Sequence, residues 1–143
     1  MGGAENCQMI LRYTLRLDHF SKIHLDNMKY FKELFQDVSW LRMQEEKHGD
    51  STWFSFGCVL QGALKGKRDK VIQAFEEGGV EARPLASGNF LNQPVVRNMP
   101  HYNHGNYEGA QDIDDNGFWV GNHSTDCKAG IFKMFTILKG LAE

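Results

Sequence analysis

EARPLASGNFLNQP, residues 81–94, is followed after a tyrosine- and histidine-rich loop by NGFWVGNH, residues 116–123. Seven asparagines lie between Asn89 and Asn122, and each of their side-chain amides can both donate and accept hydrogen bonds. Glycine and asparagine also enter left-handed backbone conformations at little cost, which is the ordinary reason for their presence in turns. On composition alone, the two segments are therefore either a set of turns or a loop suited to a polyhydroxylated ligand.

The segments before residue 81 predict a helix and two strands. Apolar residues recur every three to five positions over 20–35, which is typical of one buried helical face, and this helix is expected to begin before Leu17. Residues 38–43 and 52–60 are rich in β-branched and aromatic residues, and a turn at 49–51 separates them, so they predict an antiparallel pair. In the second run, alternation predicts a core face that makes the cysteine inert, formed by Phe54, Phe56, Cys58 and Leu60.

The remaining pattern predicts helices and strands in alternation. Residues 67–77 have helical spacing and end at two glycines, and a strand follows from Val80. Residues 106–115 predict a short acidic helix and 118–120 a short strand. The C-terminal helix is expected to start at Ser124 or Thr125. This order predicts an α+β fold, with a long N-terminal helix and a small antiparallel or mixed sheet covered by helices.

The size and charge of the chain argue against several classes of function. The 143 residues contain no repeat or linker and predict a single domain, 1–143. The net charge of -2 gives no basic field for nucleic acid. No apolar run approaches the roughly 18 residues that span a membrane, and the first residues lack signal-peptide features. Three separated cysteines form no Cys-x-x-Cys pair, which favours the reducing cytoplasm.

The order of the residues in these segments resembles a family. The run from Arg83 to Phe90, then Gln93-Pro94, then 116–123 resembles the C-terminal part of the DegT/StrS family of pyridoxal phosphate (PLP) sugar aminotransferases and dehydratases. Within that family, the match is closest to the branch that acts on nucleotide-linked 4-keto-6-deoxyhexoses in lipopolysaccharide sugar synthesis. Residues 17–35 and 51–56 are also similar to the family, so the resemblance runs over 17–143 and leaves 1–16 poorly matched.

The resemblance implies the small domain of a fold-type I PLP enzyme. Family members are far longer, and their large domain holds PLP and the catalytic lysine, or a histidine in the 3-dehydratases. We therefore expect a stand-alone or truncated domain that is not catalytic by itself and holds no cofactor. Such a domain would bind a nucleotide sugar, or complement a separate large-domain chain. It is also expected to form homo-oligomers.

Candidate substrate contacts follow from the residues and from the resemblance. Arg83 stands at a strand end, and its planar guanidinium suits a diphosphate; the alternative is a salt bridge to a nearby acid such as Glu81 or Asp112. A hydroxyl, an exposed backbone amide and a side-chain amide at Ser87, Gly88 and Asn89 suit sugar hydroxyls, unless they form an ordinary turn. The resemblance adds two more candidate substrate-binding residues, Asn122 and His123.

Two departures from the family pattern weaken the site. Ser124 stands where relatives often carry a second histidine, and Asn92 stands where an arginine is common. Two other functions remain open. In one, the fragment is a redeployed, self-associating interaction domain whose apolar surface finds a partner. In the other, three histidines and a nearby aspartate bind a metal ion; the histidines are His101, His104 and His123.

Overall fold

The sheet of this protein has the order β1-β2-β4-β3, and every neighbouring pair is antiparallel. The structure, a computed structural model, describes residue 11 and residues 14–85 and 87–143. The described strands are β1 (Leu41–Met43), β2 (Ser55–Leu60), β3 (Ala82–Pro84) and β4 (Gly117–Gly121). The described helices are α2 (Leu17–Phe35), α3 (Arg68–Glu77), α4 (Glu108–Asn116) and α5 (Lys128–Ala142). The α+β prediction is confirmed, and the sheet is antiparallel rather than mixed.

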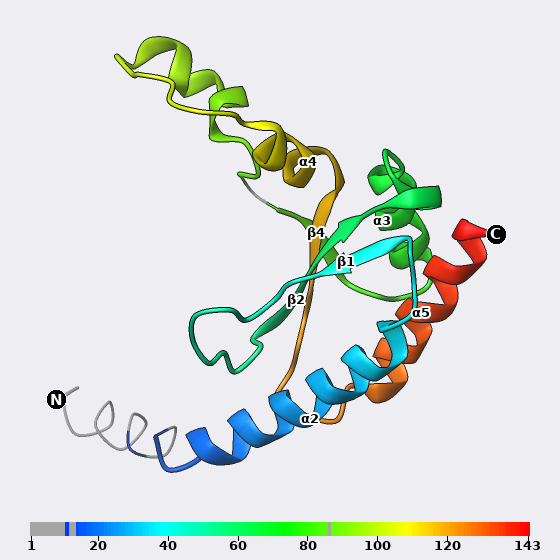
Figure 1. Ribbon diagram of the computed structural model, residues 1–143. Helices are drawn as coiled ribbons and strands as arrows, with labels where there is room; N and C mark the ends of the chain where they lie inside the picture. Colours follow the sequence, from blue (N-terminus) through cyan, green and yellow to red (C-terminus); the bar gives the residue numbers. More distant parts are fainter. Residues whose placement is uncertain (1–10, 12–13, 86) are drawn as a thin grey trace, which may run out of the picture.

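The strand register divides the sheet into two unlike faces. Phe56, Val120 and Ala82 are paired across three strands and share one face, whereas Gly57, Trp119 and Arg83 are paired and share the other. The long helices α2 and α5 pack against each other beside the sheet (Figure 1). The first face therefore carries the core, and the second is covered only in part, by α4.

The core is built around aromatic rings. Phe31 and Phe35 of α2 are 0% and 1% exposed, and the Phe31 ring lies 4.4 Å from the Phe56 ring. Phe75 of α3 meets Phe118 of β4 at 5.7 Å. Each such side chain contributes about 1.5–3 kcal/mol by leaving water. The predicted helical stripe is thus the surface that joins the helices to the sheet.

Element ends follow the local chemistry of the sequence. Helix α3 ends before Gly78-Gly79 as predicted, and Gly79 has a φ of 72°, which suits a residue without a side chain. Helix α5 begins at Lys128, later than the predicted Ser124 or Thr125. The N-cap is Cys127, and just before it the Asp126 carboxylate accepts a hydrogen bond from the backbone N–H of Lys128, the first helical residue, at 2.9 Å.

The core-face prediction is wrong for one residue. Phe56, Cys58 and Leu60 are buried, but Phe54 is 72% exposed. The neighbouring Trp53 is buried with a φ of 53°, a left-handed conformation that is uncommon for a bulky residue. This conformation breaks the alternation of the strand just before β2 begins, and Phe54 is consequently turned out to solvent.

Residues 87–107, called the arm below, project from the rest of the fold (Figure 1). The arm contains two short 3-10 helices, at Phe90–Asn92 and Pro94–Asn98, and α4 returns the chain to the sheet. At its base, the Asn92 side-chain amide donates to Asp114 Oδ2 at 2.7 Å. In the part of the chain that the structure describes, no helix is both long enough and apolar enough to cross a membrane.

Candidate functional site

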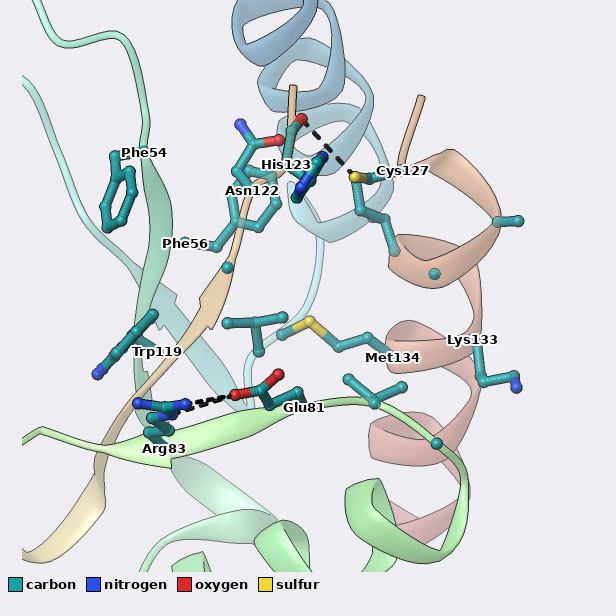
Figure 2. Close-up of a pocket in the computed structure, with 17 residues that line it drawn as sticks. Phe54, Phe56, Glu81, Arg83, Trp119, Asn122, His123, Cys127, Lys133 and Met134 are labelled. Carbon is teal, nitrogen blue, oxygen red and sulfur yellow. Dashed lines mark hydrogen bonds and ion pairs between the residues drawn. The ribbon is translucent and has the colours of Figure 1, made fainter. Parts of the chain in front are cut away.

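A cleft of about 640 Å³ lies between strands β3 and β4 and the N-terminal half of α5 (Figure 2). Its floor is apolar, with Phe56, Val120 and Met134 among its side chains. Polar groups stand around this floor. The cleft brings together three of the predicted contacts, Arg83, Asn122 and His123, and adds residues that sequence reasoning did not propose as contacts, among them Phe54, Trp119, Cys127 and Lys133.

Arg83 presents its guanidinium at the cleft. Its Nη2 and Nε donate to Glu81 Oε1 at 2.7 and 3.2 Å, which is one of the two salt bridges anticipated from the sequence. The guanidinium carbon lies 5.8 Å from the centre of the Trp119 ring. Both partners of the ion pair are largely exposed, 64% for the arginine and 79% for the glutamate side chain. Such an exposed pair contributes about 0–1 kcal/mol to stability, so another anion can take the place of the Glu81 carboxylate.

His123 is exposed, whereas its neighbour Asn122 is 4% exposed. The Asn122 amide donates to the Trp53 and His24 carbonyls at 2.7 and 3.0 Å and accepts from Asn27 at 2.9 Å. All of its hydrogen-bonding groups thus serve the protein itself. Among the residues that the structure describes, the His123 ring has one long polar contact, 3.4 Å between its Nδ1 and Thr125 Oγ1.

Asn27 of α2 is the residue that sequence reasoning missed. It is 1% exposed, its amide also donates to the Thr125 carbonyl at 2.8 Å, and its oxygen accepts from the Cys127 N–H at 3.1 Å. An asparagine inside an otherwise apolar helical stripe was the available signal, because a buried polar side chain needs partners. The Asn27–Asn122 pair fixes the loop that carries His123.

The other predicted contacts lie at the base of the arm and do not line the cleft. Asn89 is 7% exposed; its amide donates to Gln111 Oε1 at 2.9 Å and its oxygen accepts from the Leu91 N–H at 3.1 Å. Gly88 packs directly on the Asp114 backbone, where a β-carbon would collide. Ser87 is exposed. This group is thus shared between a turn and a junction with α4.

Other side chains in the fold bear on possible chemistry. Burial raises the pKa of the Cys58 thiol, which lies in the core and is unsuited to nucleophilic attack. Every lysine that the structure describes is at least partly exposed, and the one lining the cleft, Lys133, donates to the Gly78 carbonyl at 3.0 Å. A PLP-bound lysine needs a desolvated pocket, so these lysines do not fit that cofactor.

The histidines of the metal hypothesis do not converge. His101 and His104 lie in the arm, whereas His123 follows β4, at the far end of the sheet strand from the arm. Among residues 14–85 and 87–143, no three histidine, cysteine or acidic side chains are placed to hold a metal ion. The geometry therefore gives no support to that reading.

Comparisons with known proteins give relatives along most of the chain. Residues 6–133 match the model of the DegT/DnrJ/EryC1/StrS aminotransferase family. A GDP-4-keto-6-deoxy-D-mannose 3-dehydratase from Yersinia pseudotuberculosis is 34% identical over 125 residues, which are 87% of this chain and 32% of that protein. One from Escherichia coli O55:H7 is 31% identical over the same length, again 32% of its own. This chain thus spans about a third of the curated relatives that it matches.

Solved structures agree with the sequence match. The E. coli GDP-4-keto-6-deoxy-D-mannose-3-dehydratase with bound hydrated PLP superposes with a TM-score of 0.81 at 29% identity, over 90% of this chain and 33% of the enzyme. A putative sugar aminotransferase from Streptococcus pneumoniae has a TM-score of 0.74 at 15% identity, over 92% of this chain and 34% of that one, and shares the fold. The chain belongs to the DegT/DnrJ/EryC1/StrS aminotransferase family, as a partial domain of it.

Proposed function

We propose that this chain is the nucleotide-sugar-binding small domain of a PLP-dependent enzyme, and that catalysis requires a large domain, in the same or a separate chain. Support comes from relatives named as GDP-sugar dehydratases, of which the chain spans about a third. The lysines described here do not fit PLP. The domain's own part of the reaction is then to bind and orient the substrate. A cytoplasmic setting is supported by the unpaired thiols of Cys58 and Cys127.

The observation that carries this proposal is the position of Arg83. Its guanidinium is planar and presents paired N–H groups, which suit two oxygens of a diphosphate. It stands on the rim of an apolar cleft, ordered by Trp119 and by an exposed carboxylate that a diphosphate can displace. Arg42 and Arg68 do not line this cleft, and they bind Asp112 and the Asp114 carbonyl near the arm.

His123 is the second polar group open to such a ligand, because its ring keeps only one long contact. Asn122 would act on the substrate through the backbone that it holds in place. Ser87, Gly88 and Asn89 remain predicted sugar contacts. Since they do not line the cleft, we propose that a large domain or a second copy brings this loop to the sugar.

Ligand binding by the purified chain tests the proposal. Thermal-shift and calorimetric titrations with GDP-, CDP-, UDP- and dTDP-sugars should identify one nucleotide class, and ligand at 100 times its Kd stabilises by about 2.7 kcal/mol. Arg83→Ala should abolish that binding, and Arg97→Ala, which removes an exposed arginine of the arm, should not. Normal binding by Arg83→Ala would remove this arginine from the site, and no binding to the wild-type chain would contradict a self-sufficient binding domain.

A second candidate function is self-association through the arm. Three apolar side chains of the arm, Phe90, Val95 and Met99, are 55%, 51% and 51% exposed, and exposed apolar patches mark interaction sites. Light scattering after size exclusion should then give a dimer or larger species that Val95→Asp dissociates. A monomer at every concentration would contradict this function and leave the ligand proposal in place.

A further inference from the structure

We propose that Phe54 is the stacking residue for the nucleobase of a nucleoside diphosphate whose phosphates bind Arg83. Trp119 lines the same cleft between them. This inference rests on the proposed function and deepens it, because it assigns the base-recognising part of the ligand site. Figure 2 shows the three side chains along one wall of the cleft, on the side away from α5.

The exposed ring of Phe54 is held in place by its backbone. The Asn122 N–H donates to the Phe54 carbonyl at 3.0 Å, and the Asn122 side chain fixes the adjoining Trp53 carbonyl at 2.7 Å. An exposed phenylalanine on a mobile loop would need no explanation. Here a ring that is 72% exposed is anchored at the edge of an apolar cleft, which is how a stacking surface is presented at low entropic cost.

The sheet beside this ring is open at Gly121. Gly121 pairs with Ser55, next to Phe54, and a β-carbon at Gly121 would meet no atom within 4 Å. Trp119 pairs with Gly57, three positions along β2 from Phe54, a separation of about 10 Å at 3.3 Å per residue. The two rings are thus too far apart to clamp one base. Both rings line the same cleft, so each can contact a different part of one ligand, Phe54 the base and Trp119 the ribose.

The positive charge of Arg83 also suits a nucleoside diphosphate. Arg83 pairs with Trp119 in the next strand and holds its guanidinium 5.8 Å from that ring. Phe54, Trp119 and Arg83 therefore form a row with an aromatic end and a cationic end, which matches the order of base and phosphates in the ligand. Glu81 competes for the cation, so a diphosphate, with its higher charge, is favoured over a single carboxylate ligand.

A crossed calorimetric titration tests the assignment, with GDP and inorganic pyrophosphate as probes. Loss of a base-stacking ring weakens nucleotide binding roughly 5- to 150-fold. Phe54→Ala should weaken GDP by that factor and leave pyrophosphate unchanged, whereas Arg83→Ala should weaken both. The matched control is Phe132→Ala, because that ring is 54% exposed on α5 and does not line the cleft. It should bind both probes as the wild-type chain does.

Other outcomes overturn the assignment. Equal GDP affinity in Phe54→Ala and wild type, with binding still lost in Arg83→Ala, would reject base stacking and leave the proposed function intact. No GDP or GDP-sugar binding to the wild-type chain would reject both. If Phe54→Ala keeps its GDP affinity but lowers the association state seen by light scattering, the ring is a protein contact instead. Unchanged melting temperatures would show that each variant is folded.

Discussion

The Asn27–Asn122 pair and the Phe54–Trp119–Arg83 row lie on neighbouring parts of the same fold but use their side chains in opposite ways. The asparagines are 1% and 4% exposed, and their amides bond to the protein itself. The row leaves a ring and a guanidinium open to solvent. Both regions contain residue types associated with ligand binding, so residue type alone does not distinguish them.

The two regions differ in how much each side chain contributes to the free energy of folding. A buried amide that loses its partners costs the protein the full desolvation of the groups left behind. An exposed arginine or phenylalanine can be removed with little effect on stability. Residues available to a ligand should therefore be those whose loss changes binding but not melting, and each prediction below separates the regions on that basis.

The largest effect is expected for Asn122→Ala. This change removes the side-chain donor to the buried Trp53 carbonyl and one of the acceptors of the Asn27 amide, at a cost of about 2–4 kcal/mol in the free energy of unfolding. Urea denaturation followed by circular dichroism measures it. The adjacent His123→Ala, at an exposed position, is the control and should lie within about 0.5 kcal/mol of wild type. Equal stability of the two variants would show that Asn122 stabilises the fold no more than the exposed His123 does.

Gly88→Ala tests whether the base of the arm stabilises the fold, as the Asn27–Asn122 pair does, or is free to bind a ligand. Its new β-carbon would collide with the Asp114 backbone, and such overpacking costs about 1–3 kcal/mol. Hydrogen exchange should become faster in α4 before it does in α5. Gly109→Ala provides the comparison, because its β-carbon would meet open space within α4 and should be neutral or mildly stabilising. A stable Gly88→Ala with native exchange would leave this residue free for a ligand role.

The Cys58 thiol gives a pH-dependent test of the core. Burial raises the pKa of this thiol, so the folded state keeps a proton that the unfolded chain loses above about pH 8.5. This stabilisation is complete below that pH and declines as pH rises, by about 1.4 kcal/mol per unit. Urea titrations at pH 8.5 and 9.5 should therefore give a steeper loss in wild type than in Cys58→Ala.

The smallest effect on stability is expected in the open row. Arg83→Ala removes an exposed ion pair with Glu81, and the free energy of unfolding should change by less than about 0.5 kcal/mol. Nucleotide-sugar affinity should nevertheless be lost. The comparison would break if this variant melted well below wild type, since its binding defect would then report damage to the fold.

The fold was predictable where the sequence had a strong apolar periodicity or a clear helix-terminating signal. The apolar repeat of α2, the glycines after α3 and the alternation within β2 each gave the right element. Strand ends were less accurate, because β1 and β2 are bounded by pairing and not by composition. Phe54 was misplaced since the left-handed backbone at Trp53 leaves no trace in a period-two pattern.

The candidate site was predictable only in part. Arg83 and His123 could be singled out, and both are open at the cleft. The sequence could not tell that Asn122 and Asn89 are occupied by partners 95 and 22 positions away, because those contacts exist only in the folded chain. The departure at Asn92 likewise has a local role, since its amide binds Gln111 and Asp114 at the base of the arm.

The strand order has a consequence for synthesis. Strand β4 follows the other three strands of the sheet in the chain, yet it lies between β2 and β3. On the ribosome, both of those strands therefore present unpaired edges until Gly121 has emerged. At about 5–20 residues per second, the stretch from Pro84 to Gly121 takes roughly 2–7 s to make. Premature termination within it would release a product with two open strand edges, the feature that promotes aggregation.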